Sequence, residues 1–156
     1  MGRSTGSSEP ICTIGYEGTT FDAVARTLAD AGVRLLIDVR AVASSRKPGF
    51  SKRLLAASLA EAGIDYVHLQ PLGTPKPGRE AVRRGDPATM KRIYATHMKG
   101  AEPQAALAEA RERAGATRAC LLCFERDHTT CHRTLVAEMI AAKTGQEIKH
   151  LTPPLP

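Results

Sequence analysis

Short apolar segments of β-strand length alternate with helical segments along this chain. The apolar segments cover residues 11–16, 34–39, 64–69, 117–124 and 147–151. The segments between them have helical patterns, such as the i, i+3, i+4, i+7 spacing of Phe21, Val24, Ala25 and Leu28. Strands that alternate with helices indicate βαβ units. We therefore expect the α/β class, as a single three-layer domain with helices on both faces of a mostly parallel sheet of about five strands.

The length of 156 residues fits one domain. We expect residues 1–10, MGRSTGSSEP, to form a flexible tail and residues 11–156 to form the single α/β domain. No apolar run approaches the roughly 20 residues that cross a bilayer, and the tail lacks the apolar stretch of a secretory signal. The sequence therefore predicts a cytoplasmic protein with no membrane segment.

Four cysteines are spread over the chain. Structural disulfides are rare in a reducing cytoplasm, so we expect the thiols to be buried apolar groups, metal ligands or nucleophiles. Cys12 and Cys120 lie inside predicted strands, which favours a place in the core. Cys123 ends a predicted strand and Cys131 begins a predicted helix, so these two are the candidates for chemistry.

A cluster of positive charge follows the third predicted strand. Residues 70–86 are rich in proline, glycine and arginine, which predicts a long loop, and such loops are often functional. Between residues 76 and 92, six basic residues against two acidic ones give +4 of the net charge of +6. This segment is either a solvated surface or a surface that binds phosphate groups or nucleic acid. Its basic residues are Lys76, Arg79, Arg83, Arg84, Lys91 and Arg92.

Polar side chains gather where the predicted strands end. The carboxyl ends of parallel strands share one edge of a sheet, and ligands of such folds bind there, so we expect these side chains to meet in one pocket. They are Tyr16, Glu17, Asp38, Arg40, Cys123 and Glu125, followed by Cys131, His132 and Arg133 at the start of the last predicted helix.

This predicted pocket suits a small anionic ligand. The first turn of a helix has unpaired N–H groups and a positive dipole end, so residues 131–133 should attract anions and lower the pKa of the Cys131 thiol. Arginine side chains hold phosphate, sulfate or carboxylate through paired hydrogen bonds. The predicted anion-binding residues are Arg40, Arg133, Tyr16 and Asp38. The catalytic candidates are Cys123 and Cys131 as thiol groups, and Glu125, His132 and Glu17 for proton transfer.

Four motifs give the chain a resemblance to a known family. They are TIGYEG at 13–18, IDVR at 37–40, R-x-P-G-F at 46–50 and C-F-E-x5-C-H-R at 123–133. In these motifs, the chain resembles the domain-of-unknown-function family 488 (DUF488). The resemblance implies a compact cytosolic α/β domain and supplies no established activity. By position, the marker residues of the family fall on Gly15, Tyr16, Gly18, Asp38, Arg40, Pro48, Gly49, Phe50, Cys123, Glu125, Cys131, His132 and Arg133.

Zinc is one alternative for the late cysteines. Cys123, Cys131 and His132, with His128 as a further candidate, are residue types that bind zinc. However, the spacing Cys-x7-Cys-His is not a familiar zinc pattern, so we predict no cofactor and keep zinc as an alternative.

Three other functional interpretations of these residues need sequence motifs that the chain lacks. A rhodanese-like persulfide on Cys123 would need a Gly- and Arg-rich loop after it, and a tyrosine-phosphatase-like loop would need an arginine closer to it. Residues 15–18 lack the full dinucleotide-binding fingerprint. An ion-pair network without catalysis and a nucleic-acid-associated module that uses residues 76–92 both remain open. The sequence does not decide whether the protein is an enzyme.

Overall fold

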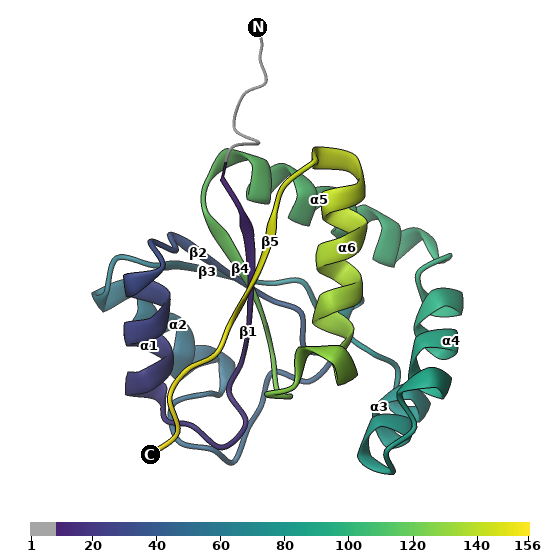
Figure 1. The fold of residues 1–156 in the computed structure, drawn as a ribbon, viewed down its shortest axis with the longest axis horizontal. Helices are drawn as coiled ribbons and strands as arrows, with labels where there is room; N and C mark the ends of the chain where they lie inside the picture. The colour runs from purple at the N-terminus through teal and green to yellow at the C-terminus, as the bar shows by residue number, and fades with distance from the viewer. Residues whose placement is uncertain (1–8) are drawn as a thin grey trace, which may run out of the picture.

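Within residues 9–156, which are the residues that the computed structural model describes, five strands form one parallel sheet (Figure 1). Their order across the sheet is β3-β2-β4-β1-β5. The carboxyl ends of β1, β2 and β4 lie side by side, because Gly15 pairs with Cys123 and Asp38 pairs with Leu122. The strands are β1 (Ile11–Gly15), β2 (Leu35–Asp38), β3 (Asp65–His68), β4 (Ala119–Cys123) and β5 (Ile148–Leu151).

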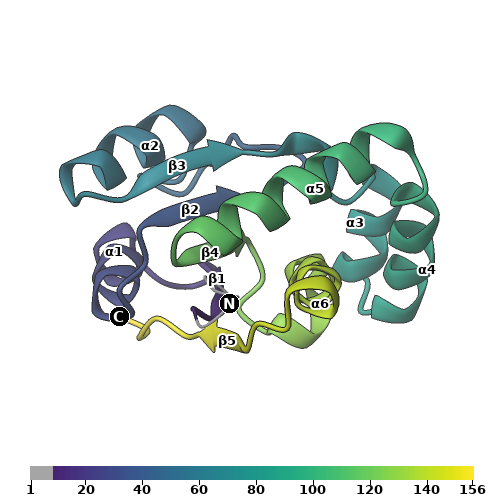
Figure 2. The ribbon, with the colours of Figure 1, turned by 90° about the horizontal axis from the view of Figure 1, so that it is seen from above.

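Helices cover both faces of this sheet (Figure 2). Helices α1 (Phe21–Asp30) and α2 (Lys52–Glu61) pack on one face, and α5 (Ala101–Ala116) and α6 (His132–Thr144) pack on the other. Helices α3 (Lys76–Arg83) and α4 (Pro87–His97) lie farther from the sheet, on the side of α5 and α6. The architecture confirms the predicted three-layer α/β domain. Among residues 9–156, no helix combines the length and apolar character needed to cross a membrane.

The alternation of side chains along the strands divides the core into two halves. In β4, Leu121 points to the side of α5 and α6, whereas Cys120 and Leu122 point to the side of α1 and α2. Burial on both faces explains why this strand is a nearly continuous apolar run. Cys12 and Cys120 are both buried in the half beside α1 and α2, which confirms their predicted place in the core.

The prediction of one long loop over residues 70–86 is wrong. This segment forms a 3-10 helix, η2 (Gln70–Leu72), and then α3. Pro77 lies in the first turn of α3, where backbone N–H groups have no helical partner, so its missing N–H costs nothing. Gly78 is buried, and a Cβ atom at this position would lie 2.5 Å from Cγ2 of Thr74. Tight packing of α3 therefore outweighs the low helix propensity of its first residues.

The predicted tail has only its last two residues within the described part of the chain. Residues 1–8 lie outside it. Glu9 accepts a hydrogen bond from Nε of Arg118 at 2.8 Å, and its backbone carbonyl accepts one from Gln146 at 2.9 Å. Pro10 is buried. Glu9 and Pro10 therefore pack with the folded domain.

Candidate functional site

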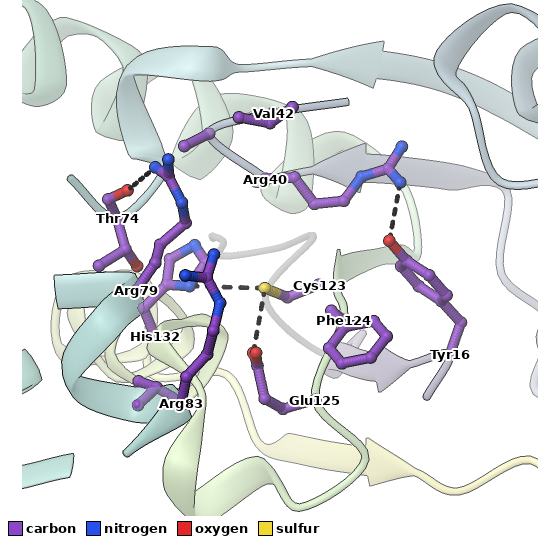
Figure 3. Close-up of a pocket in the computed structure, with 12 residues that line it drawn as sticks. Tyr16, Arg40, Val42, Thr74, Arg79, Arg83, Cys123, Phe124, Glu125 and His132 are labelled. Carbon is purple, nitrogen blue, oxygen red and sulfur yellow. Dashed lines mark hydrogen bonds between the residues drawn. The ribbon is translucent and has the colours of Figure 1, made fainter. Parts of the chain in front are cut away.

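A cavity of about 430 Å³ opens at the carboxyl ends of β1, β2 and β4 (Figure 3). Five of the nine residues predicted for the pocket line it, from the ends of three strands and the start of α6. These five are Tyr16, Arg40, Cys123, Glu125 and His132. Four other predicted residues, Glu17, Asp38, Cys131 and Arg133, do not line it. The carboxyl edge of the sheet therefore brings together part of the predicted set.

Two glycines allow the loops around the cavity to pack closely. A Cβ atom at Gly15 would lie 1.9 Å from the carbonyl oxygen of Glu125. A Cβ atom at Gly73 would lie 2.2 Å from Cα of Ala41. No other residue type fits either position without movement of the backbone, so these glycines hold the loops after β4 and β2 against their neighbours.

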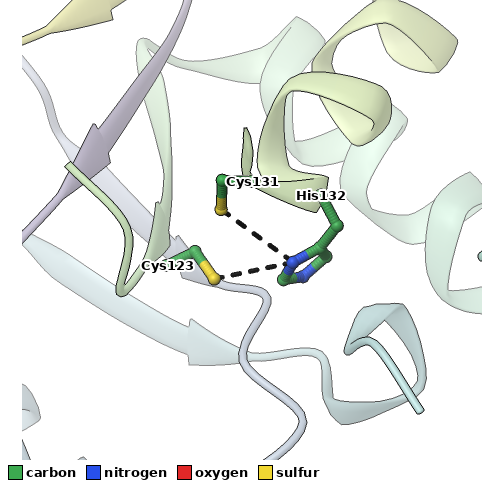
Figure 4. A group of neighbouring side chains, drawn as sticks. All are labelled: Cys123, Cys131 and His132. Atoms are coloured by element: carbon green, nitrogen blue, oxygen red, sulfur yellow. Dashed lines mark hydrogen bonds between the residues drawn. The ribbon is translucent and has the colours of Figure 1, made fainter. Parts of the chain in front are cut away.

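Cys123 and His132 form a thiol–imidazole pair at the cavity. The Sγ of Cys123 lies 3.5 Å from Nδ1 of His132 (Figure 4). The other ring nitrogen, Nε2, lies 2.7 Å from the carbonyl oxygen of Val39. Because a carbonyl only accepts hydrogen bonds, Nε2 carries the proton of the neutral ring, and the lone pair of Nδ1 faces the sulfur.

Cys131 lies behind this pair, next to the same nitrogen. Its Sγ is 4.0 Å from Nδ1 of His132 (Figure 4), and its side chain is buried away from the cavity. Cys131 caps α6 but accepts no hydrogen bond from the helix through its side chain. Burial raises the pKa of the Cys131 thiol well above its ordinary value. The prediction of a lowered pKa is therefore wrong, because burial and the neighbouring Cys123 raise the pKa more than His132 lowers it.

The two predicted glutamates occupy different surroundings. Glu125 lines the cavity, and its Oε1 accepts from the Cys123 thiol at 3.6 Å. Glu17 is exposed, and its Oε1 accepts a hydrogen bond from the backbone N–H of Arg126 at 3.0 Å. Glu125 can take part in chemistry at Cys123, whereas Glu17 fixes the loop that follows β4.

Asp38 and Arg40 form a buried ion pair beside the cavity. The distance between Nη2 of Arg40 and Oδ2 of Asp38 is 2.7 Å, and Nε of Arg40 donates to Oδ1 at 2.9 Å. Nη1 of Arg40 donates to the hydroxyl of Tyr16 at 3.0 Å and to the carbonyl of Phe50 at 2.7 Å. Figure 3 shows the guanidinium turned toward Tyr16 and away from Cys123. Arg40 therefore has most of its donors engaged within the protein.

Carboxylate contact also sets the ionisation of the groups around Asp38. Burial disfavours the charged guanidinium, but Asp38 raises the pKa of Arg40 above its ordinary value. Burial and a 2.5 Å hydrogen bond to Asp38 raise the pKa of Tyr66. Asp38 thus joins the buried Arg40 and the half-buried Tyr66 in one hydrogen-bonded polar cluster beside the cavity.

Arg133 lies outside the cavity and is almost fully buried. Its Nε donates to the hydroxyl of Thr13 at 3.1 Å, and Nη1 donates to the carbonyl of Glu125. Nη2 lies 3.4 Å from the carbonyl of Arg126. These contacts tie the loop after β4 to the middle of β1, so Arg133 supports the wall of the cavity from behind.

Helix α3 supplies cavity residues that the sequence analysis assigned only to a basic surface. Arg79, Val82 and Arg83 line the cavity, and Nη1 of Arg79 donates to the carbonyl of Thr74 at 2.8 Å. Their i, i+3, i+4 spacing is that of one helix face, which would have grouped them if the helix had been predicted. The remaining basic residues of the segment are exposed and do not line the cavity: Lys76, Arg84, Lys91 and Arg92.

Apolar side chains form another part of the cavity wall. Val42 is 52% exposed and Phe124 is 44% exposed, and both line the cavity. These two exposed side chains provide a contact surface for an apolar group of a ligand.

Three residues, two of which line the cavity and one of which lies behind them, could hold a metal ion. One ligand atom from each of Cys123, Cys131 and His132 lies within 4.8 Å of the other two. His128, the fourth candidate from the sequence, is not part of this group. Its ring instead stacks on His150, with 3.6 Å between the ring centroids.

Together, these features define a class of protein: a parallel α/β domain with a thiol–imidazole centre at the floor of a cavity at the carboxyl edge of its sheet. The chain belongs to the DUF488 family, because the family model "Domain of unknown function DUF488" matches residues 20–140. The matched region includes the motifs at 37–40, 46–50 and 123–133, which confirms the resemblance. A search of curated proteins and a search of solved structures both find no match.

Proposed function

We propose that this protein is a thiol-dependent enzyme that binds a small anionic substrate in the cavity beside α3. One observation carries the proposal: the thiol of Cys123 lines the same cavity as Arg79 and Arg83. Cationic groups raise the local concentration of an anionic substrate and orient its charged group. A sulfur nucleophile that faces such a cavity suits a negatively charged substrate.

The cavity walls favour a substrate with an anionic group and an apolar part. Neither Arg79 nor Arg83 forms a salt bridge with a described carboxylate, so both can pair with a ligand. Val42 and Phe124 offer exposed apolar surface that gains free energy when a ligand covers it. The volume of about 430 Å³ is that of a pocket for a small molecule.

His132 is positioned to activate the sulfur. The thiol proton of Cys123 passes to Nδ1 of His132, 3.5 Å away, and leaves a thiolate. The thiolate bonds to an electrophilic atom of the substrate, and a leaving group departs with the electrons of the bond that breaks. Glu125, 3.6 Å from the sulfur, is a second group close enough to exchange a proton there. The cytoplasm, which the sequence predicts as the location, would keep the thiol reduced.

Alkylation with two reagents of different charge tests this proposal. Iodoacetate and iodoacetamide both form a carbon–sulfur bond and release iodide, but only iodoacetate is an anion. In reduced, chelator-treated protein we expect Cys123 to react before Cys12, Cys120 and Cys131, with peptide mapping by mass spectrometry as the readout. We also expect the iodoacetate-to-iodoacetamide rate ratio at Cys123 to exceed that of free cysteine by about tenfold.

Three arginine variants supply the control. Arg79→Gln and Arg83→Gln should bring the rate ratio toward that of free cysteine. Arg84→Gln should leave it unchanged, because Arg84 is exposed, does not line the cavity, and pairs with Asp86 at 3.8 Å. If Cys123 is alkylated no faster than the buried Cys120, the proposal of a reactive thiol at Cys123 is overturned. An unchanged ratio in both cavity variants would overturn the anion site.

The nucleic-acid-associated module stays a prediction. All of its basic residues are exposed except Arg79, which is half-buried; they are Lys76, Arg79, Arg83, Arg84, Lys91 and Arg92. Phosphate contacts would make the affinity for an oligonucleotide fall steeply with salt. Salt-dependent binding that is lost in a Lys91→Gln, Arg92→Gln double variant and kept in Arg79→Gln would favour this module over the cavity.

A further inference from the structure

We infer that Cys123, Cys131 and His132 form a zinc site with one coordination position open to the cavity. A metal ion bound by these three side chains goes beyond the proposed substrate site, which consists of the Cys123 thiol and the arginines of α3. Two cysteines nine-tenths or more buried and one histidine direct their ligand atoms to a common point, within 4.8 Å of one another.

The separations of the ligand atoms are close to those of a tetrahedral zinc site. Zinc lies about 2.3 Å from a thiolate and about 2.0 Å from an imidazole nitrogen, so tetrahedral angles give S···N separations of about 3.5 Å. The corresponding distances to Nδ1 of His132 are 3.5 Å from Cys123 and 4.0 Å from Cys131. Both dashed lines in Figure 4 end on the same nitrogen, so one ion can contact all three atoms after small side-chain shifts.

The orientation of His132 is the one that a metal ligand requires. Histidines that bind a metal through one nitrogen commonly donate the other N–H to a carbonyl or a carboxylate. Nε2 of His132 meets the backbone carbonyl of Val39 at 2.7 Å. This contact leaves the lone pair of Nδ1 directed at the two sulfur atoms, and it fixes the plane of the ring.

The ligand set indicates zinc with an incomplete protein shell. Thiolate and imidazole groups together favour zinc over oxygen-seeking cations such as magnesium or calcium. Cys123 and His132 line the cavity and Cys131 does not, so the open side of the three-ligand group faces the cavity. The carboxylate of Glu125, 3.6 Å from the Cys123 sulfur, lies beside this open side, where a water molecule or a substrate oxygen can complete the shell.

Zinc would occupy the place of the thiol protons between sulfur and nitrogen. Zinc-bound cysteine is a thiolate, so the ion would keep Cys123 ionised without proton transfer to His132. The zinc-loaded and metal-free proteins then differ in how the sulfur is activated. The arginine side of the cavity is the same in both.

Metal analysis and cobalt substitution test the site in the full-length protein. Protein purified under reducing conditions without added chelator should contain one zinc per chain by elemental mass spectrometry. After chelation, addition of Co²⁺ should give the intense visible absorption of tetrahedral cobalt and a near-ultraviolet thiolate-to-cobalt band. X-ray absorption of the zinc protein should show two sulfur neighbours at about 2.3 Å.

Matched cysteine variants assign the ligands. Cys131→Ser should weaken zinc binding at least tenfold, whereas Cys12→Ser, also at a buried cysteine, should keep one zinc per chain. Wild-type protein that holds no zinc and gives only the weak absorption of octahedral cobalt would overturn the inference, whatever the variants do. Alkylation of metal-free protein answers the separate question of the anion site, so either proposal can fail while the other stands.

Discussion

Arg40 reaches back over Asp38 at the end of β2, and the two side chains make three hydrogen bonds with no more than 4% of either exposed. The same guanidinium holds the hydroxyl of Tyr16 and the carbonyl of Phe50, which belong to the loops after β1 and β2. The pair therefore fixes the geometry of two loops of the cavity. This relationship gives Arg40 a supporting role next to its predicted role in anion binding.

Removal of one charge of the Asp38–Arg40 pair should destabilise the folded protein. Asp38→Asn leaves the guanidinium of Arg40 buried without a counter-charge, so we expect a loss of about 3–5 kcal/mol in the free energy of unfolding. Urea denaturation followed by circular dichroism measures it. The control is Glu109→Gln, which breaks the exposed Glu109–Arg113 pair and should cost at most about 0.5 kcal/mol. Equal losses in the two variants would contradict the supporting role of the buried pair.

Gly15→Ala should disturb the site as well as the fold. The new Cβ would meet the carbonyl of Glu125, so the loop after β4 must move, at a cost of about 1–3 kcal/mol. We also expect slower alkylation of Cys123, because Glu125 and Cys123 belong to the displaced segment. Gly115→Ala is the control: it lies in α5, where a Cβ meets nothing within 4 Å, and should stabilise the protein by about 0.5–1 kcal/mol.

Arg133→Lys separates a supporting role from an anion-binding role. Lysine cannot reach Thr13 and the carbonyl of Glu125 with the forked geometry of arginine, so unfolding should become easier by about 2–3 kcal/mol. We expect the iodoacetate preference of Cys123 to persist, measured by the same alkylation rates. A variant of unchanged stability that loses this preference would instead support the anion-binding role predicted from the sequence.

Acid should weaken the fold through His150. Burial, and then the neighbouring charges of His128 and Arg133, lower the pKa of His150 from its ordinary value of 6.5. The unfolded chain therefore binds this proton at higher pH than the folded one does. The contribution of His150 to stability is complete above pH 6.5 and declines as the pH falls below it. Urea midpoints between about pH 5 and pH 7.5 should fall less steeply with acid in His150→Gln than in the wild type. Parallel slopes would contradict this assignment.

The strands and most helices could be predicted from the sequence because their signals are local. The run at 34–39 is apolar enough to indicate burial on both faces, and Asp86 before Pro87 marks the start of α4, where its side chain accepts from the N–H of Thr89. The helix at Lys76–Arg83 was missed for the opposite reason. Its first turn contains Pro77 and Gly78, and the close approach of Thr74, which no local sequence signal of a helix indicates, favours glycine there.

The candidate site was predictable as far as strand ends define it. Tyr16, Arg40 and Cys123 follow from the rule that ligands bind at the carboxyl edge. The place of Arg79 and Arg83 in the cavity could not be predicted, because it depends on helix α3, whose first residues have low helix propensity. The burial of Cys131 and Arg133 could not be predicted either. The sequence at the start of a helix does not indicate whether a side chain there faces water or packs against a neighbouring strand.

Arg79, Val82 and Arg83 sit on a short helix that takes no part in the sheet, whereas Cys123 and His132 belong to a strand and the helix that follows it. In the proposed enzyme, the residues that select the substrate and the residues that react with it therefore lie in separate segments of the chain. We expect that exchange of these three side chains on α3 changes the charge or shape of the ligand that binds and leaves the sulfur centre intact.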